Sequence, residues 1–155
     1  MRAEDVDTPA LIVEMDALER NLRRMAGAAA RAGARLRPHA KMHNCPALAL
    51  RQIALGAVGV CCQKVSEAEA MVAGGVTDDL ISNDIVGASK LARLAALARH
   101  ARIGVCVYDA GNAGALSIAA CTAGTSVDAY VEFYVGANRR GVEAVWPVSA
   151  RGAMW

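Results

Sequence analysis

The chain has 155 residues, of which 55% are hydrophobic, and its formal net charge is +2. This length suits one domain with a hydrophobic core, and no apolar run reaches the roughly 18 residues that a membrane span needs. Basic and acidic residues are interspersed, which argues against nucleic acid as the main partner. The polar N-terminus shows no secretory signal, so we expect a cytoplasmic protein that binds neither membrane nor nucleic acid. The five cysteines are odd in number and none has zinc-finger spacing, so the adjacent Cys61 and Cys62 are expected to be reduced and buried.

Strand-like apolar runs alternate with helix-like segments along the whole chain. Helices are indicated by apolar residues that recur with a period near 3.6, and strands by short continuous apolar runs. One helix is expected to start at Ser66, a favourable N-cap residue. In chain order, the sequence predicts a strand over 10–16, a helix over 17–33, a strand over 35–41, a helix over 45–56, a strand over 58–64, a helix over 66–75, a strand over 79–84, a helix over 87–101, a strand over 102–109, a helix over 110–124 and a strand over 126–135.

This strict alternation with short connections predicts an α/β protein with a parallel sheet. No G-x-G-x-x-G fingerprint follows the first strand, which favours a barrel over an open dinucleotide-binding sheet. A complete (β/α)8 barrel needs about 200 residues or more, so the sequence predicts a partial (β/α)8 TIM-type barrel. We expect that domain to cover residues 1–143, and residues 144–155 to form an atypical, irregular tail.

A basic cluster closes the second predicted strand, at residues 35–46. The side chains of Arg37, His39, Lys41 and His43 have the period-two spacing of one strand face. Active sites of parallel β/α folds are built at this carboxyl end of the strands. Three interpretations remain open: a metal site, in which Lys41 would repel the ion, a solvated basic patch, or a lysine nucleophile. Beside other cations in a partly dry cleft, the lysine would keep less of its preference for the charged form, and the neutral amine could form a Schiff base.

Polar residues also follow the other predicted strands. Each of them alone is more often a helix cap or a turn residue than a ligand, and Ser66 and Asp109 in particular have cap-like positions. Together they predict a polar rim at one edge of the sheet. The rim comprises Gln63, Lys64, Ser82, Asn83, Asp84, Tyr108, Asp109, Glu132, Tyr134 and the loop over residues 136–141.

Four segments give the chain a resemblance to a known family. The segments are VDTPALIVEMDALERNL, the run from LRPHAK to EAMVAGG, ISNDIVG and VEFYVGANRRGV. They closely resemble the N-terminal half of D-threonine aldolases, which belong with D-serine dehydratases and D-threo-3-hydroxyaspartate dehydratases. The resemblance covers about residues 5–143 and implies the fold-type III pyridoxal phosphate architecture, with an alanine racemase N-terminal-like barrel. It also implies that the first predicted strand belongs to a second domain.

The resemblance implies roles for four residues. Lys41 matches the family's cofactor lysine, which would hold pyridoxal 5'-phosphate as a Schiff base, and Arg139 matches the arginine that faces the pyridine ring. His39 and Gln63 would line the same pocket. A divalent metal of the Mn type is implied for the full-length family, but its ligands lie in the second half and are absent here. Enzymes of this family can dimerise, so a homodimer is among the assemblies that the resemblance implies.

The activity implied by the resemblance is a lyase reaction on a D-3-hydroxy amino acid. In the aldolases the Cα–Cβ bond breaks, and D-threonine gives glycine and acetaldehyde. In the dehydratases the Cα proton is removed and hydroxide leaves from Cβ. Both remain open, and so does a chain that is catalytically dead because half of the barrel is missing. The sequence departs from the family's pattern at Asn44, Tyr108, Tyr134 and Arg140.

Overall fold

The computed structural model describes residues 2–134, 136, 141 and 142. Helices and strands alternate from residue 46 onward, as the apolar pattern predicts. The elements are η1 (Ala3–Asp5), α1 (Met15–Arg31), η2 (Ala40–Met42), α2 (Pro46–Ala54), β1 (Val60–Cys62), α3 (Val65–Ala73), β2 (Asp78–Asp84), α4 (Ala88–Leu97), β3 (Arg102–Val107), α5 (Ala110–Ala123) and β4 (Asp128–Val131). Of these helices, none has the length and apolar character to cross a membrane.

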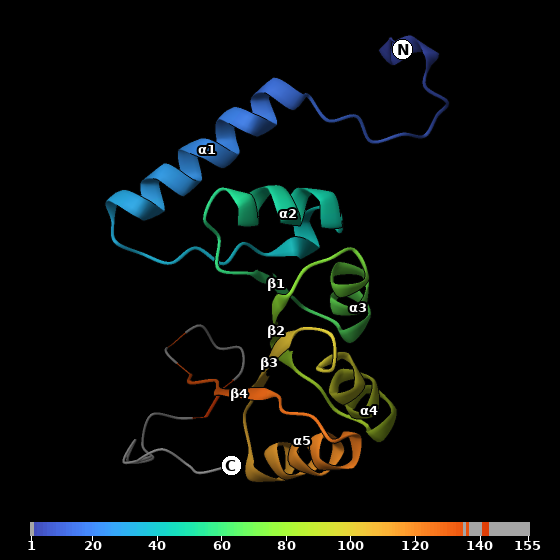
Figure 1. The fold of residues 1–155 in the computed structure, drawn as a ribbon, viewed down its shortest axis with the longest axis vertical. Helices are drawn as coiled ribbons and strands as arrows, with labels where there is room; N and C mark the ends of the chain where they lie inside the picture. The colour runs from blue at the N-terminus through green and yellow to red at the C-terminus, as the bar shows by residue number, and fades with distance from the viewer. Residues whose placement is uncertain (1, 135, 137–140, 143–155) are drawn as a thin grey trace.

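The four strands form one parallel sheet in the order β1-β2-β3-β4. Helices α3, α4 and α5 lie along one side of the sheet, and α1 and α2 lie beyond its β1 end (Figure 1). Each connection from one strand to the next contains a helix, which is the repeating unit of a parallel barrel. The structure therefore confirms the predicted α/β fold with the sheet of a partial barrel.

The hydrophobic core lies between the sheet and helices α3 to α5. Alternate strand residues point into it, and among them Ile81, Ile103 and Val105 are at most 1% exposed. The opposite face of the sheet, which we call the open face, carries the intervening residues. There a Cβ atom on Gly104 would lie 2.7 Å from a ring carbon of Tyr130, so the Tyr130 ring packs directly over the glycine. The open face corresponds to the interior of the barrel.

The predicted strand over residues 10–16 is wrong. These residues have no strand partner within the described chain, and the side chain of Leu11 is 93% exposed. Helix α1 already begins at Met15, because the Glu14 side chain accepts a hydrogen bond from the Ala17 amide and caps its first turn. An apolar run can pair as a strand only where a neighbouring strand is present to satisfy its backbone groups.

The predicted strand over residues 35–41 is present only as an irregular extended segment. The Leu36 carbonyl accepts from the Val58 amide at 2.9 Å, and the Pro38 carbonyl accepts from the Cys61 amide at 2.8 Å. His39 then forms an isolated parallel bridge with Cys61. Proline has no amide hydrogen, which interrupts the hydrogen-bond ladder at the centre of this segment. The segment therefore lies beside β1 and extends the sheet without forming a regular strand.

Four further predictions have different outcomes. Ser66 is not the N-cap of α3, because the helix begins one residue earlier and the Glu67 carboxylate accepts from the Gln63 and Lys64 amides. The last predicted strand is shorter than expected, since β4 ends at Val131. All five cysteines are free, and Cys61 and Cys62 are buried as predicted. The tail over residues 144–155 lies outside the described residues, and its boundary stays a prediction.

Candidate active site

The carboxyl edge of the sheet brings together most of the predicted site. His39 and Lys41 follow the extended segment beside β1, Gln63 follows β1 itself, and Ser82 lies near the end of β2. The parallel direction of all strands puts these ends at one edge. Lys41 is exposed there and lies in η2, not in a strand. The sequence pattern therefore placed Lys41 at the correct edge, although its local structure differs from the expected one.

The His39 side chain fixes the backbone that carries Lys41. Its Nδ1 atom accepts a hydrogen bond from the Lys41 amide at 3.3 Å, which caps the first turn of η2. The Nε2 atom lies 3.4 Å from Ser82 Oγ, so the ring is held between η2 and β2. The Ser82 hydroxyl in turn donates to the Cys62 carbonyl at 3.3 Å. These contacts connect the extended segment with β1 and β2.

Burial lowers the pKa of His39, and the positive charge of Lys41 lowers it further. The negative charge of Glu67 and a hydrogen bond to the Cys61 backbone act in the opposite direction but do not outweigh these effects. His39 is therefore a neutral imidazole at neutral pH. Its half-buried ring adds no charge to the surroundings of the Lys41 amine.

Gln63 lies at the same edge, in the turn between β1 and α3. Its backbone amide donates to Glu67 Oε2 at 2.8 Å, which orients the start of α3. Glu67 was not recognised from the sequence as part of this region. Its position in the sequence could have indicated this role, because Glu67 follows Lys64 by three residues, which is the spacing of a capping-box glutamate from its N-cap residue.

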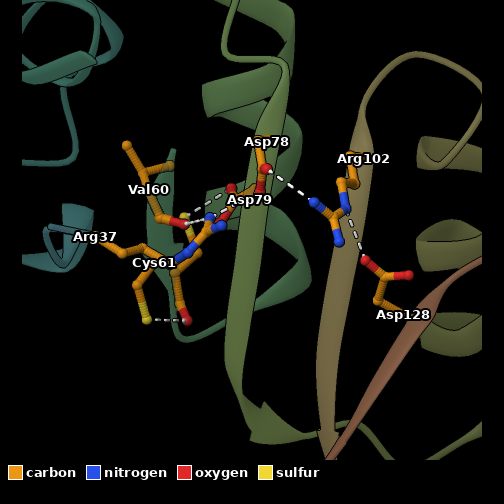
Figure 2. A network of polar contacts seen from close by, with 8 residues as sticks. Arg37, Val60, Cys61, Asp78, Asp79, Arg102 and Asp128 are labelled. Atoms are coloured by element: carbon orange, nitrogen blue, oxygen red, sulfur yellow. Dashed lines mark hydrogen bonds and ion pairs between the residues drawn. The ribbon is translucent and has the colours of Figure 1, made fainter. Parts of the chain in front are cut away.

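Arg37 does not join the cluster as predicted. Figure 2 shows its guanidinium directed toward the starts of β1 and β2, where Nη1 donates to the Val60 carbonyl at 3.1 Å and to Asp78 Oδ1 at 2.8 Å. Asp78 Oδ2 lies 3.8 Å from an Arg102 nitrogen, and Arg102 donates to Asp128 at 2.8 Å. We call Arg37, Asp78, Arg102 and Asp128 the charge ladder. It lies at the opposite edge of the sheet from Lys41.

Two other members of the predicted clusters have local structural roles. His43 Nδ1 accepts from the Cys45 amide at 3.0 Å, which shapes the turn into α2. Asp109 Oδ1 accepts from the Asn112 amide at 2.7 Å and so caps α5, as its cap-like position predicts. The His43 side chain therefore bonds within its own turn, whereas the His39 side chain bonds to the Lys41 amide.

Cys106 is a residue of the open face that the sequence did not single out as a site residue. Burial raises the pKa of its thiol, and the negative charge of Glu132 raises it further. The group is therefore a neutral thiol near the carboxyl edge, with the Glu132 carboxylate in its electrostatic surroundings. The sequence could have indicated this position, because Gly104 and Cys106 are two residues apart in β3 and therefore lie on the same face of the sheet.

Two expectations concern groups that the described residues do not contain. Arg139, the predicted partner of the pyridine ring, lies outside the described residues. No cluster of three or more His, Cys, Asp or Glu side chains that could hold a metal occurs in the part of the chain that the structure describes.

Comparison with known proteins gives one family and a consistent set of relatives. The family described as alanine racemase, N-terminal domain, matches residues 13–150. The chain is 53% identical over 137 residues to a D-threonine aldolase from Arthrobacter sp., a match that covers 88% of this chain and 36% of that protein. It is 44% identical over 158 residues to a 3-hydroxy-D-aspartate aldolase from Paracoccus denitrificans, covering 99% and 41%.

Solved structures show the same relationship. The D-threonine aldolase from Filomicrobium marinum matches with a TM-score of 0.88 and 60% identity, over 91% of this chain and 38% of that one. The D-threo-3-hydroxyaspartate dehydratase from Delftia sp. HT23 matches with a TM-score of 0.81 and 30% identity, over 90% and 37%. The chain thus spans between 36% and 41% of the length of these relatives. These matches confirm the resemblance and the partial-barrel fold that the sequence predicts: the chain belongs to the alanine racemase N-terminal domain family.

Proposed function

We propose that this chain provides the lysine-bearing part of a pyridoxal phosphate-dependent lyase that cleaves D-3-hydroxy amino acids. The observation that carries the proposal is the position of Lys41, an exposed amine at the carboxyl edge of a parallel sheet, with its backbone held by His39. The two aldolase relatives, at 53% and 44% identity, favour cleavage of the Cα–Cβ bond.

The groups at this edge fit the reactive part of pyridoxal phosphate. A primary amine can bind the aldehyde carbon covalently, and the exposed Lys41 presents one at this edge. When bound, the cofactor supplies the electron sink for cleavage at Cα. Lys41 would bind it, His39 and Gln63 would line its pocket, and Arg139 would face its ring nitrogen. A divalent metal and a homodimer also stay predictions.

The chain's own residues would define the environment of that amine. The neutral His39 ring adds no positive charge next to Lys41, and its contact with Ser82 limits its motion. The Cys106 thiol is protonated, so it does not compete with Lys41 as a nucleophile for the aldehyde. The exposed amines near this edge of the described sheet are then those of Lys41 and Lys64, and we assign the reaction to Lys41.

Cofactor binding is tested by incubating the chain with pyridoxal phosphate, reducing with borohydride and locating the modified residue by mass spectrometry. Reduction makes the linkage permanent, so the expected product carries the label on Lys41 and Lys41→Ala abolishes it. Lys64→Ala is the matched control, because Lys64 is also exposed and lies near the same edge. Labelling that persists in Lys41→Ala, or that Lys64→Ala abolishes, would contradict the assignment.

Activity is tested with D-threonine and Mn²⁺, both for the chain alone and for the chain mixed with the separately produced remainder of a D-threonine aldolase. Equal amounts of glycine and acetaldehyde are expected wherever cleavage occurs. The alternative activity is dehydration, because one relative of 30% identity is a dehydratase. Formation of ammonia and 2-oxobutanoate from D-threonine would identify that activity. A chain that binds the cofactor but forms neither product pair in either mixture would be a catalytically dead fragment.

A further inference from the structure

Both nitrogen atoms of the His39 ring have a defined partner from the chain. Nδ1 lies 3.3 Å from the Lys41 amide nitrogen, and Nε2 lies 3.4 Å from Ser82 Oγ. Ser82 Oγ also lies 3.3 Å from the Cys62 carbonyl oxygen. These atoms form a continuous chain of contacts that runs from β1 through β2 to the 3-10 turn that carries Lys41.

The chemistry of the two ends fixes the direction of every hydrogen bond in this chain. A backbone amide can only donate, so Nδ1 must be unprotonated, and the proton of the neutral ring is on Nε2. A carbonyl can only accept, so the Ser82 hydroxyl donates to Cys62 and its oxygen is available to accept from Nε2–H. The arrangement is consistent at each step and allows one tautomer of His39.

We propose that Ser82 is a positioning residue that locks His39 in the neutral, Nε2-protonated tautomer and thereby fixes the backbone of Lys41. In this role His39 is a support for the lysine and not a proton acceptor in the site, because its unprotonated nitrogen is occupied by the Lys41 amide. A catalytic effect of this positioning rests on the proposed function of Lys41. The hydrogen-bond chain itself does not depend on that function.

The charged groups around His39 agree with a neutral ring. Burial and the Lys41 ammonium lower its pKa, and the opposing influences come from Glu67 of α3 and the Cys61 backbone of β1. The Ser82 side chain is exposed, so replacing it changes the hydrogen-bond chain without opening a cavity in the core. Ser82→Ala is therefore a suitable variant, and Ser82→Thr keeps the hydroxyl as the conservative control.

The tautomer is measured directly by long-range ¹H–¹⁵N NMR of the histidine rings in the chain without cofactor. His39→Gln assigns the His39 signal, and His100, in a remote turn, reports whether the fold is unchanged. We expect wild type and Ser82→Thr to show an unprotonated Nδ1 and a protonated Nε2. In Ser82→Ala we expect averaged shifts for a mixture of tautomers, together with exchange of the Lys41 amide that is about three to ten times faster, the effect of losing one hydrogen bond.

Each outcome supports or overturns the proposal separately from the proposed function. An unchanged His39 tautomer and unchanged Lys41 exchange in Ser82→Ala would overturn it, and so would a wild-type ring protonated on Nδ1. If the NMR result is as expected but no pyridoxal phosphate binds to Lys41, the proposed function fails while the positioning role of Ser82 stands. If borohydride labels Lys41 but Ser82→Ala leaves the His39 tautomer unchanged, the positioning role of Ser82 fails while cofactor binding at Lys41 stands.

Discussion

The Cys62 thiol donates a hydrogen bond to Asp79 Oδ2 over 3.1 Å inside the hydrophobic core. Asp79 is completely buried, and it is the one fully buried charged residue in the described part of the chain. Its second oxygen, Oδ1, has no hydrogen-bond partner there. Burial raises the pKa of Asp79 to about 6, although the Cys62 hydrogen bond and the charge of Arg37 act against this. Burial also raises the pKa of the Cys62 thiol, which keeps it a donor.

The raised pKa of Asp79 predicts a stability that falls as the pH rises. Below pH 3.8, its ordinary value, both the folded and the unfolded chain hold the proton; between 3.8 and about 6 only the folded chain holds it. The free energy of unfolding should therefore decrease by about 3 kcal/mol across this window and level off above it. Asp79→Asn should remove this component, as measured by urea unfolding from pH 4 to pH 8.

The matched control for this prediction is Asp78→Asn. Asp78 is adjacent in sequence but pairs with Arg37, so its carboxylate stabilises the fold at neutral pH. Asp78→Asn should lower stability at pH 7, whereas Asp79→Asn should raise it relative to wild type. The assignment fails if the pH dependence of Asp79→Asn parallels that of the wild type.

Gly59 is required by the close packing of Arg37 against the start of β1. A Cβ atom at residue 59 would lie 2.6 Å from Arg37 Nη1 and would collide with the Asp78 carbonyl, and the backbone φ is +153°. Gly59→Ala should therefore destabilise the fold by about 2 to 4 kcal/mol. Gly114→Ala, in the open interior of α5, should instead stabilise it by about 0.5 to 1 kcal/mol. Thermal unfolding of both variants checks this opposite response.

Asp109 should contribute to stability as a helix cap. Removing its acceptor oxygen with Asp109→Ala leaves the Asn112 amide unpaired and should cost about 1 kcal/mol. Asp109→Asn keeps an acceptor oxygen and should lose only part of this. Urea unfolding should give a lower midpoint with an unchanged slope. Equal losses in the two variants would show that charge, and not the cap, is responsible.

Asn44 ends the turn that carries Lys41 in a left-handed backbone conformation, with φ of +48°. The backbone amide of Asn44 donates to the Ala40 carbonyl at 2.8 Å, so the turn fixes this backbone conformation. Asn44→Gly should keep the stability close to wild type, whereas Asn44→Val should lower it by about 1 to 2 kcal/mol. Comparison of the two melting temperatures tests this, and equal values would contradict the claim that backbone conformation governs the position.

The regular part of the fold was predictable because its strands are buried and periodic. From β1 to β3, apolar residues on one face of the sheet are covered by helices, and that burial leaves a clear pattern in the sequence. Residues 10–16 carry a similar apolar pattern, but a pattern does not reveal whether a partner strand lies alongside. Pro38 can be read from the sequence, but whether it interrupts the backbone hydrogen bonds of a strand depends on how residues 35–41 align with β1.

The edge at which the candidate site residues lie was predictable from the sequence, but their contacts were not. The resemblance and the strand end both point to Lys41, and the structure places it at the expected edge with His39 and Gln63. Arg37 has the same period-two spacing, but its long side chain reaches the opposite edge because Gly59 leaves room for it. The contact between His39 and Ser82 joins residues 43 positions apart, and spacing carries no information about such a contact.

The charge ladder has a consequence for how the strands find their alignment. A shift of one residue between neighbouring strands is excluded because it would turn the apolar side chains away from the helices. A shift of two residues would keep every side chain on its own face, so burial alone discriminates poorly against it. Such a shift would separate Arg102 from both Asp78 and Asp128. The alternating charges therefore distinguish the native alignment from a two-residue shift, which the apolar pattern tolerates. They do so on both sides of β3, toward β2 and toward β4.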